Sequence, residues 1–332
     1  MSDFDQLPLF DSSADDTVEG EARTAADIVL DANTPLDDAL LVYLDNLERS
    51  GASHHTIKAF RSDLRLLGRW SGFGTPVSDY STAKLNRFLH WMLTERDKPC
   101  STKTYARRVT TLKNFFNYLS DANVIPRDPA AAIIQKTVQS PLPDVLLNAE
   151  RELVRKVTMG IRADPHSPDA RPHLLATLLL ETGIKKAECM ALRREDFLRE
   201  RAAGPQIWIR YDNPKMRYKE RKIDVGGELL EVLDEYLAQR RPEDIIFDCT
   251  PRNLEYVLRD VALAAGIEKS KMSFETLRWT CAYTDFVAGM DRDRLREKLG
   301  LSRISWRDTS ARLAELADMY GEDVPENQED NG

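Results

Sequence analysis

Two segments in the last third of the chain decide how its fold is predicted, namely SFETLRWT (273–280) and LGLSRISWRDTS (299–310). The first segment opens a predicted helix over 274–289, and a shorter predicted helix over 312–320 follows the second segment. Arg278 lies in the first segment, one helical turn after Glu275. Residues at this spacing can form a salt bridge, whereas an unpaired guanidinium is well suited to bind a phosphate group. The sequence leaves both roles open for Arg278.

Length and composition indicate a protein with two domains and no membrane span. A chain of 332 residues can bury two cores. Because the longest apolar runs fall well short of the roughly 18 residues that a membrane helix needs, and the N-terminus is acidic, we expect a cytoplasmic, nucleoid-associated protein. Four cysteines are scattered without metal-ligand spacing, so we expect free thiols, no metal and no cofactor.

The net charge of −8 is unevenly distributed along the chain. Residues 1–35 hold nine acidic residues and one arginine, and residues 315–332 hold seven acidic residues and no Lys or Arg. The body between these two segments therefore carries a net charge of +7. A basic body with acidic ends is compatible with a nucleic-acid partner.

Helical spacing dominates the first half of the body. We predict a disordered acidic tail over 1–35 and a helical domain over 36–130. In the helix that follows Ser53, a plausible N-cap, apolar residues recur at helical spacing on one face. A basic stripe runs along the same helix at Lys58, Arg61, Arg65 and Arg69. Taken alone, such a stripe is more typical of a solvated helix face.

The second half of the body mixes helices with a hairpin. A linker over 131–147 leads into a domain over 148–320, and an acidic tail follows over 321–332. Alternating residues predict strands over 206–211 and 221–225, joined by a basic turn. The remaining periodic segments are helical, so the predicted fold class is α+β, mostly α, with a small β-sheet.

Several motifs resemble the tyrosine recombinase (phage integrase) family, Xer-like members included. SHHTIKAFRSDL (53–64) and STKTYARR (101–108) resemble its core-binding helices, and TGIKKAECMAL (182–192) resembles its first catalytic box. The resemblance implies an N-terminal four-helix SAM-like domain, an integrase-type catalytic domain, double-stranded DNA as partner, and a homo- or hetero-oligomer on DNA. It also implies that the C-terminal helix packs on a neighbouring protomer, although Leu313, Leu316 and Ala317 suit packing on their own domain equally well.

In the family the site holds two arginines, a lysine, a histidine three residues before the second arginine, a histidine or tryptophan in the third box, and a nucleophilic tyrosine. By resemblance these positions fall on Lys185, Lys215, Glu275, Arg278, Leu301 and Ser310, with Lys219 as the alternative for the lysine. The second arginine and the hairpin lysine are kept, whereas the other positions carry different residue types. A carboxylate repels a phosphate, and a serine without a nearby base is a weak nucleophile.

The hypothesis is therefore a DNA-binding protein that has lost strand cleavage. The alternatives are an active recombinase that uses Tyr320 or is completed in trans, and an adaptor or structural subunit of a recombination or replication complex. The expected DNA contacts are Lys58, Arg61, Arg65, Lys103, Arg107, Arg108, Lys185, Lys215, Arg217, Lys219, Arg221 and Arg278.

A short motif in the acidic tail suggests a second partner. QLPLF (6–10) resembles the pentapeptide that docks bacterial proteins on the replicative sliding clamp. Leu7, Leu9 and Phe10 would enter an apolar cleft, with Gln6 at its rim. A chance apolar patch is the alternative explanation.

Overall fold

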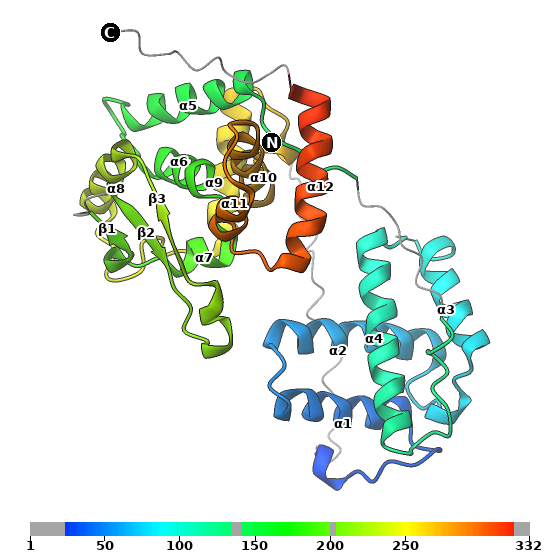
Figure 1. The fold of residues 1–332 in the computed structure, drawn as a ribbon. Coiled ribbons are helices and arrows are strands. Elements are labelled where there is room, and N and C mark those ends of the chain that lie inside the picture. The colour runs from blue at the N-terminus through cyan, green and yellow to red at the C-terminus, as the bar shows by residue number, and fades with distance from the viewer. Residues whose placement is uncertain (1–23, 98, 134–140, 200–203, 322–332) are drawn as a thin grey trace, which may run out of the picture. The chain divides into compact units, whose positions relative to one another are not determined.

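The computed structural model describes residues 24–97, 99–133, 141–199 and 204–321 (Figure 1). The chain divides into two compact units, Met1–Ser140 and Pro141–Gly332. Within the described residues, no helix is both long and apolar enough to span a membrane.

Four α-helices build the described part of the first unit. They are α1 (Leu36–Arg49), α2 (His54–Ser71), α3 (Thr82–Thr94) and α4 (Thr102–Asp121), with short 3-10 helices η1 (Ala25–Asp27) and η2 (Val77–Asp79). The side chain of Ser53 accepts a hydrogen bond from the Thr56 N–H at 3.1 Å, which confirms it as the N-cap of α2. Leu64 and Leu67 of α2 are fully buried among aromatic side chains of α3 and α4.

The second unit combines helices with one small sheet. Its helices are α5 (Asn148–Arg162), α6 (Arg171–Thr182), α7 (Lys186–Ala191), α8 (Gly227–Arg240), α9 (Pro251–Ala265), α10 (Phe274–Val287), α11 (Arg292–Lys298) and α12 (Arg303–Tyr320). Strands β1 (Phe197–Leu198), β2 (Gln206–Ile209) and β3 (Arg221–Asp224) form an antiparallel sheet in the order β1-β2-β3. The short 3-10 helices of this unit are η3 (Arg194–Asp196), η4 (Pro214–Lys219) and η5 (Lys269–Lys271).

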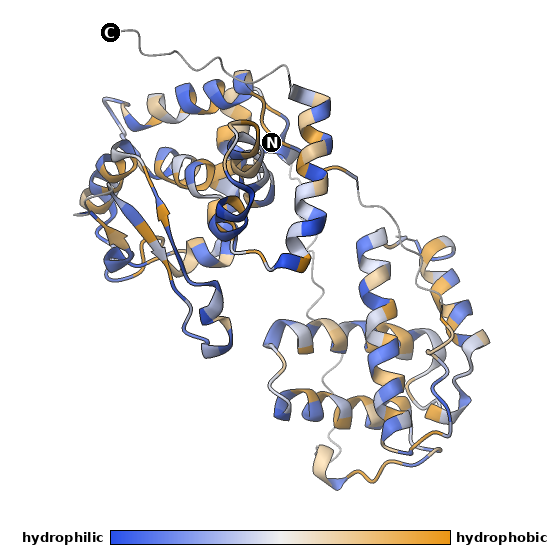
Figure 2. Cartoon of the chain, in the orientation of Figure 1, coloured by the Kyte–Doolittle hydropathy of each residue, from blue (hydrophilic) through white to orange (hydrophobic). Residues whose placement is uncertain are grey.

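The predicted fold class is confirmed, and the differences lie near the predicted site. Orange and blue alternate around most helices, as expected for segments with one buried face (Figure 2). The sequence did not reveal β1 or α11, and the last helix begins at Arg303 rather than at Arg312. Ser302 caps this longer helix by accepting a hydrogen bond from the Ser305 N–H at 3.2 Å. As a result, Ser310 lies inside a helix and not in the loop before one.

The apolar face of α12 packs on its own unit. Leu313 and Leu316 are buried against Ala282 and Tyr283 of α10 and Leu295 of α11. This observation resolves the alternative that the sequence left open for these residues. In this structure the helix does not present its leucines to a neighbouring protomer.

Candidate nucleic-acid interface

Four of the positions assigned by resemblance line one cavity of about 700 Å³, namely Lys185, Glu275, Arg278 and Leu301. Three separate parts of the unit bring them together: the residue before α7, the first turn and a half of α10, and the loop between α11 and α12. These four positions were assigned by resemblance to the family motifs, and they lie around one cavity. Lys215 and Ser310 do not line this cavity, whereas Thr309 does.

Arg278 is held by main-chain oxygens. Its Nη1 donates to the carbonyl of Gly183, and its Nη2 donates to the carbonyl of Leu299 at 2.6 Å. Burial lowers the pKa of this guanidinium, and the nearby Glu188 carboxylate partly offsets the effect. Arg278 thus ties the turn before α7 to the end of α11.

The salt-bridge role considered for Arg278 is not found. Glu275 is exposed at the start of α10, and no ion pair within 4.0 Å joins it to Arg278 in the described residues. The carboxylate instead borders the cavity beside the guanidinium. A phosphate that entered the cavity would meet this negative charge.

A buried ion cluster contacts the main chain of Lys185, one of the residues that line the cavity. Glu188 accepts two hydrogen bonds from Arg221, at 3.2 and 2.9 Å, and one from the Tyr211 hydroxyl. The Lys185 main-chain N–H donates to the same carboxylate at 2.8 Å. Gly300 must stay small beside this cluster, because a Cβ atom there would lie 2.7 Å from Nη1 of Arg221.

This cluster corrects one predicted contact. The Arg221 side chain is only 8% exposed and its guanidinium is fully engaged, so it serves Glu188 rather than DNA. Tyr211 was missed from the sequence, although its place just beyond β2 puts its ring near α7. The Lys185 side chain, 39% exposed, keeps its ammonium 3.9 Å from Glu188. Burial lowers the pKa of Lys185, an effect that the carboxylate opposes.

The candidate nucleophiles lie away from the cavity. Ser310 donates its hydroxyl to the Arg307 carbonyl of the same helix at 3.3 Å. Tyr320 lies ten residues further along α12, which corresponds to about 15 Å of helix. Its backbone carbonyl accepts a hydrogen bond from the Tyr283 hydroxyl at 3.1 Å.

Cations outside the cavity form two exposed groups. The tip of the β2–β3 hairpin, η4, presents Lys215 and Arg217 as exposed side chains, with Lys219 half-buried. In the first unit the predicted DNA contacts Lys58, Arg61, Arg65 and Lys103 are exposed. None of these seven cations forms an ion pair with another described residue.

Arg107 and Arg108, also expected to contact DNA, turn inward. Both pair with the carboxylate of Asp63, which is 3% exposed and also accepts the Thr111 hydroxyl at 2.9 Å. The Arg108 side chain is 12% exposed. These two arginines therefore neutralise a buried aspartate between α2 and α4.

The fold defines a class of protein: a helical SAM-like unit followed by a mixed unit of integrase type. The family model for the phage integrase N-terminal SAM-like domain matches residues 41–123. The tyrosine recombinase XerD of Listeria monocytogenes is 27% identical over 287 residues, which covers 81% of this chain and 92% of the relative. The XerD of Shewanella oneidensis is 28% identical over 309 residues, covering 86% and 96%.

Solved structures share the fold. The XerH site-specific recombinase bound to palindromic difH substrate superposes with a TM-score of 0.65 at 20% identity, covering 86% of this chain and 87% of its own. A lambda integrase dimer bound to a COC′ core site gives a TM-score of 0.63 at 15% identity, covering 83% and 77%. The chain is thus similar to tyrosine recombinases over most of its length, and its first unit matches the phage integrase SAM-like domain.

Proposed function

We propose that this protein binds double-stranded DNA through a tyrosine recombinase scaffold that has lost strand cleavage. One observation carries the proposal: the cavity that gathers Lys185, Glu275, Arg278 and Leu301 lacks the groups that the reaction needs. Lysine offers a charge without the planar fork that orients a phosphate. The guanidinium of Arg278 is already bonded to two carbonyls.

The histidine or tryptophan that the family uses for proton transfer is replaced by Leu301 in this cavity. General acid and base catalysis needs a titratable group within hydrogen-bond reach of the reacting oxygen. Leu301 has no polar side-chain atom, and no histidine is among the lining residues. Ser310 has only a carbonyl acceptor beside its hydroxyl, and a carbonyl does not activate a nucleophile.

DNA binding draws support from the exposed cations and from the relatives. Two structural neighbours are recombinases whose structures contain DNA substrates or core sites. In this chain, exposed lysines and arginines of α2 and η4 are free to neutralise phosphates. Because such contacts release counterions, the affinity should depend steeply on salt.

The displaced-nucleophile alternative is weaker. Tyr320 lies about three helical turns beyond Ser310. Its use would require the end of α12 to leave the core that Leu313 and Leu316 help to form. An active site completed in trans by a partner protomer would still contain the carboxylate of Glu275, which repels a phosphate.

The proposal is tested with duplexes selected by this protein from a random pool, each carrying one nick at a successive position. Anisotropy should show affinity falling at least about 100-fold between 50 and 200 mM salt, as expected for four or more phosphate contacts. Denaturing gels of the same mixtures should show no covalent protein–DNA adduct. An adduct would contradict the loss of cleavage, and its absence in Tyr320→Phe would identify the nucleophile. Undetectable duplex binding at low salt would refute DNA binding.

The sliding-clamp motif Gln6–Phe10 lies outside the described residues, and its role stays a prediction from sequence. Replacing Leu9 and Phe10 by alanine is expected to abolish capture by an immobilised sliding clamp, because the two side chains would fill its apolar cleft. DNA affinity of the same variant should not change. Unchanged capture would rule out the motif, and with it the replication link of the adaptor hypothesis.

A further inference from the structure

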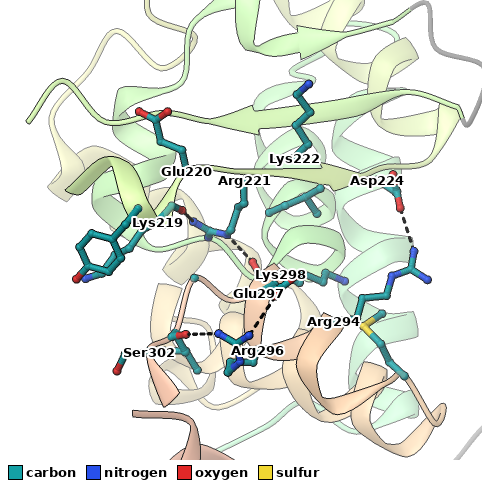
Figure 3. Close-up of a pocket in the computed structure, with 15 residues that line it drawn as sticks. Lys219, Glu220, Arg221, Lys222, Asp224, Arg294, Arg296, Glu297, Lys298 and Ser302 are labelled. Carbon is teal, nitrogen blue, oxygen red and sulfur yellow. Dashed lines mark hydrogen bonds and ion pairs between the residues drawn. The ribbon is translucent and has the colours of Figure 1, made fainter. Parts of the chain in front are cut away.

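A second cavity, of about 750 Å³, lies between β3, α11 and the loop that precedes α12. Figure 3 shows the cationic residues that line it on β3 and α11, with Arg221 extending from β3 towards α11 and Lys222 extending away from α11. Its volume falls in the range of cavities that hold small organic ligands. Six of the lining residues are cationic: Lys219, Arg221, Lys222, Arg294, Arg296 and Lys298.

Most of these cations already have partners. Lys298 pairs with Asp285 at 2.6 Å, Arg294 pairs with Asp224 at 3.1 Å, and Arg296 pairs with acidic neighbours on α11. Lys219 and Lys222 form no ion pair with any described residue. Lys222 lies with its ammonium 5.1 Å from the centre of the Trp208 ring, which does not line this cavity, so a new anion here would meet Lys219 first.

An aromatic ring borders the same cavity. Tyr218 is 73% exposed, and no other Phe, Tyr or Trp in the described residues is more than 39% exposed. The ammonium of Lys219 lies 5.3 Å from the centre of the Tyr218 ring. The turn is held in shape by Asn213, whose side chain accepts the Lys215 N–H at 3.0 Å.

We propose that this cavity binds an unpaired nucleotide of DNA, with its base stacked on Tyr218 and its phosphate held by Lys219. The inference rests on the proposed DNA binding. Flat exposed rings next to cations are the usual platform for bases that lie outside the helical stack. In an intact duplex both faces of each base are covered by neighbouring pairs, so the ring would have no base face to contact. The protein would thus favour DNA that carries a bulge or a gap.

The test compares a paired duplex with the same duplex carrying a single 2-aminopurine bulge. The protein should bind the bulged DNA about tenfold more tightly, with a decrease in 2-aminopurine fluorescence as the base stacks. Tyr218→Ala should bring the ratio of the two affinities close to one. Tyr218→Phe should keep the ratio, because the ring rather than the hydroxyl makes the contact.

Tyr256→Ala on α9 is the matched control. Tyr256 is also exposed and also lies between cations, with Arg259 at 4.6 Å and Arg252 at 5.5 Å from its ring centre, but it does not line the cavity. Its loss should leave the preference intact. Failure to bind either DNA would refute the proposed function, whereas equal binding of both would refute this inference alone. An equal loss of both affinities in Tyr218→Ala would place the ring against paired DNA and overturn the proposal.

Discussion

Glu188→Ala is expected to destabilise the second unit by about 3–5 kcal/mol, the cost of removing one partner from a buried ion pair. The substitution leaves Arg221, whose side chain is 8% exposed, without the carboxylate that accepts its two hydrogen bonds. It also removes the acceptor of the Tyr211 hydroxyl. Urea unfolding of the full chain, with hydrogen exchange followed in peptides from 182–225, would measure the loss and assign it to this unit.

Lys186→Ala is the control for this prediction. Lys186 lies on the same short helix as Glu188 and pairs with Glu255 of α9 at 2.8 Å, but both side chains are about half exposed, at 47% and 48%. Exposed pairs contribute at most about 1 kcal/mol. Similar losses for Glu188→Ala and Lys186→Ala would show that the cluster around Glu188 does not hold the fold together.

The same cluster predicts an acid transition. Burial alone would raise the pKa of Glu188, but the hydrogen bonds and charge of Arg221 outweigh burial and lower it from 4.5 to about 2. Because the folded value is depressed, the stabilisation is complete above about pH 4.5 and is lost as the pH falls towards 2. The difference in unfolding free energy between the wild type and Glu188→Gln should therefore shrink over this range. A constant difference would contradict the assignment.

The sequence predicted most of the fold where packing follows a regular period. The apolar stripe of α2 and the serine at its N-cap correctly predicted a buried helix in the first unit. The start of α12 was missed because residues 303–311 are rich in serine, threonine and charged residues, which have little helical pattern of their own. Ser302 and the core around Leu313 fix that helix instead.

The site was predictable only in part, because a sequence pattern gives the positions of side chains but not the main-chain groups that hold them. Lys185, Glu275, Arg278 and Leu301, which the family resemblance singled out, line one cavity, whereas Lys215 and Ser310 do not. The partners of Arg278 are main-chain carbonyls, which no side-chain pattern encodes. Likewise, charge alone could not separate cations that face solvent from Arg221, which a buried glutamate retains.

The last prediction concerns the basic stripe of α2, whose cations face solvent and are not held by a buried carboxylate. Lys58, Arg61 and Arg65 are exposed and have no ion-pair partner among the described residues. Each phosphate contact contributes about 0.9 to the slope of log affinity against log salt. If all three bind phosphates, replacing them together by alanine should lower the magnitude of that slope by about 2.7. Anisotropy with one duplex at five salt concentrations measures it.

Arg107→Ala separates this stripe from the other arginines of the first unit. Its partner Asp63 is buried and would lose one of its donors, so this variant should lose about 1–3 kcal/mol of stability. Its salt slope should stay close to that of the wild type, because the guanidinium is already paired with the Asp63 carboxylate, although the side chain is 40% exposed. A smaller salt slope for Arg107→Ala, together with an unchanged slope for the triple variant of α2, would mean that the stripe is only a solvated helix face. In that case the DNA contacts of this unit would have to start from the Asp63 cluster.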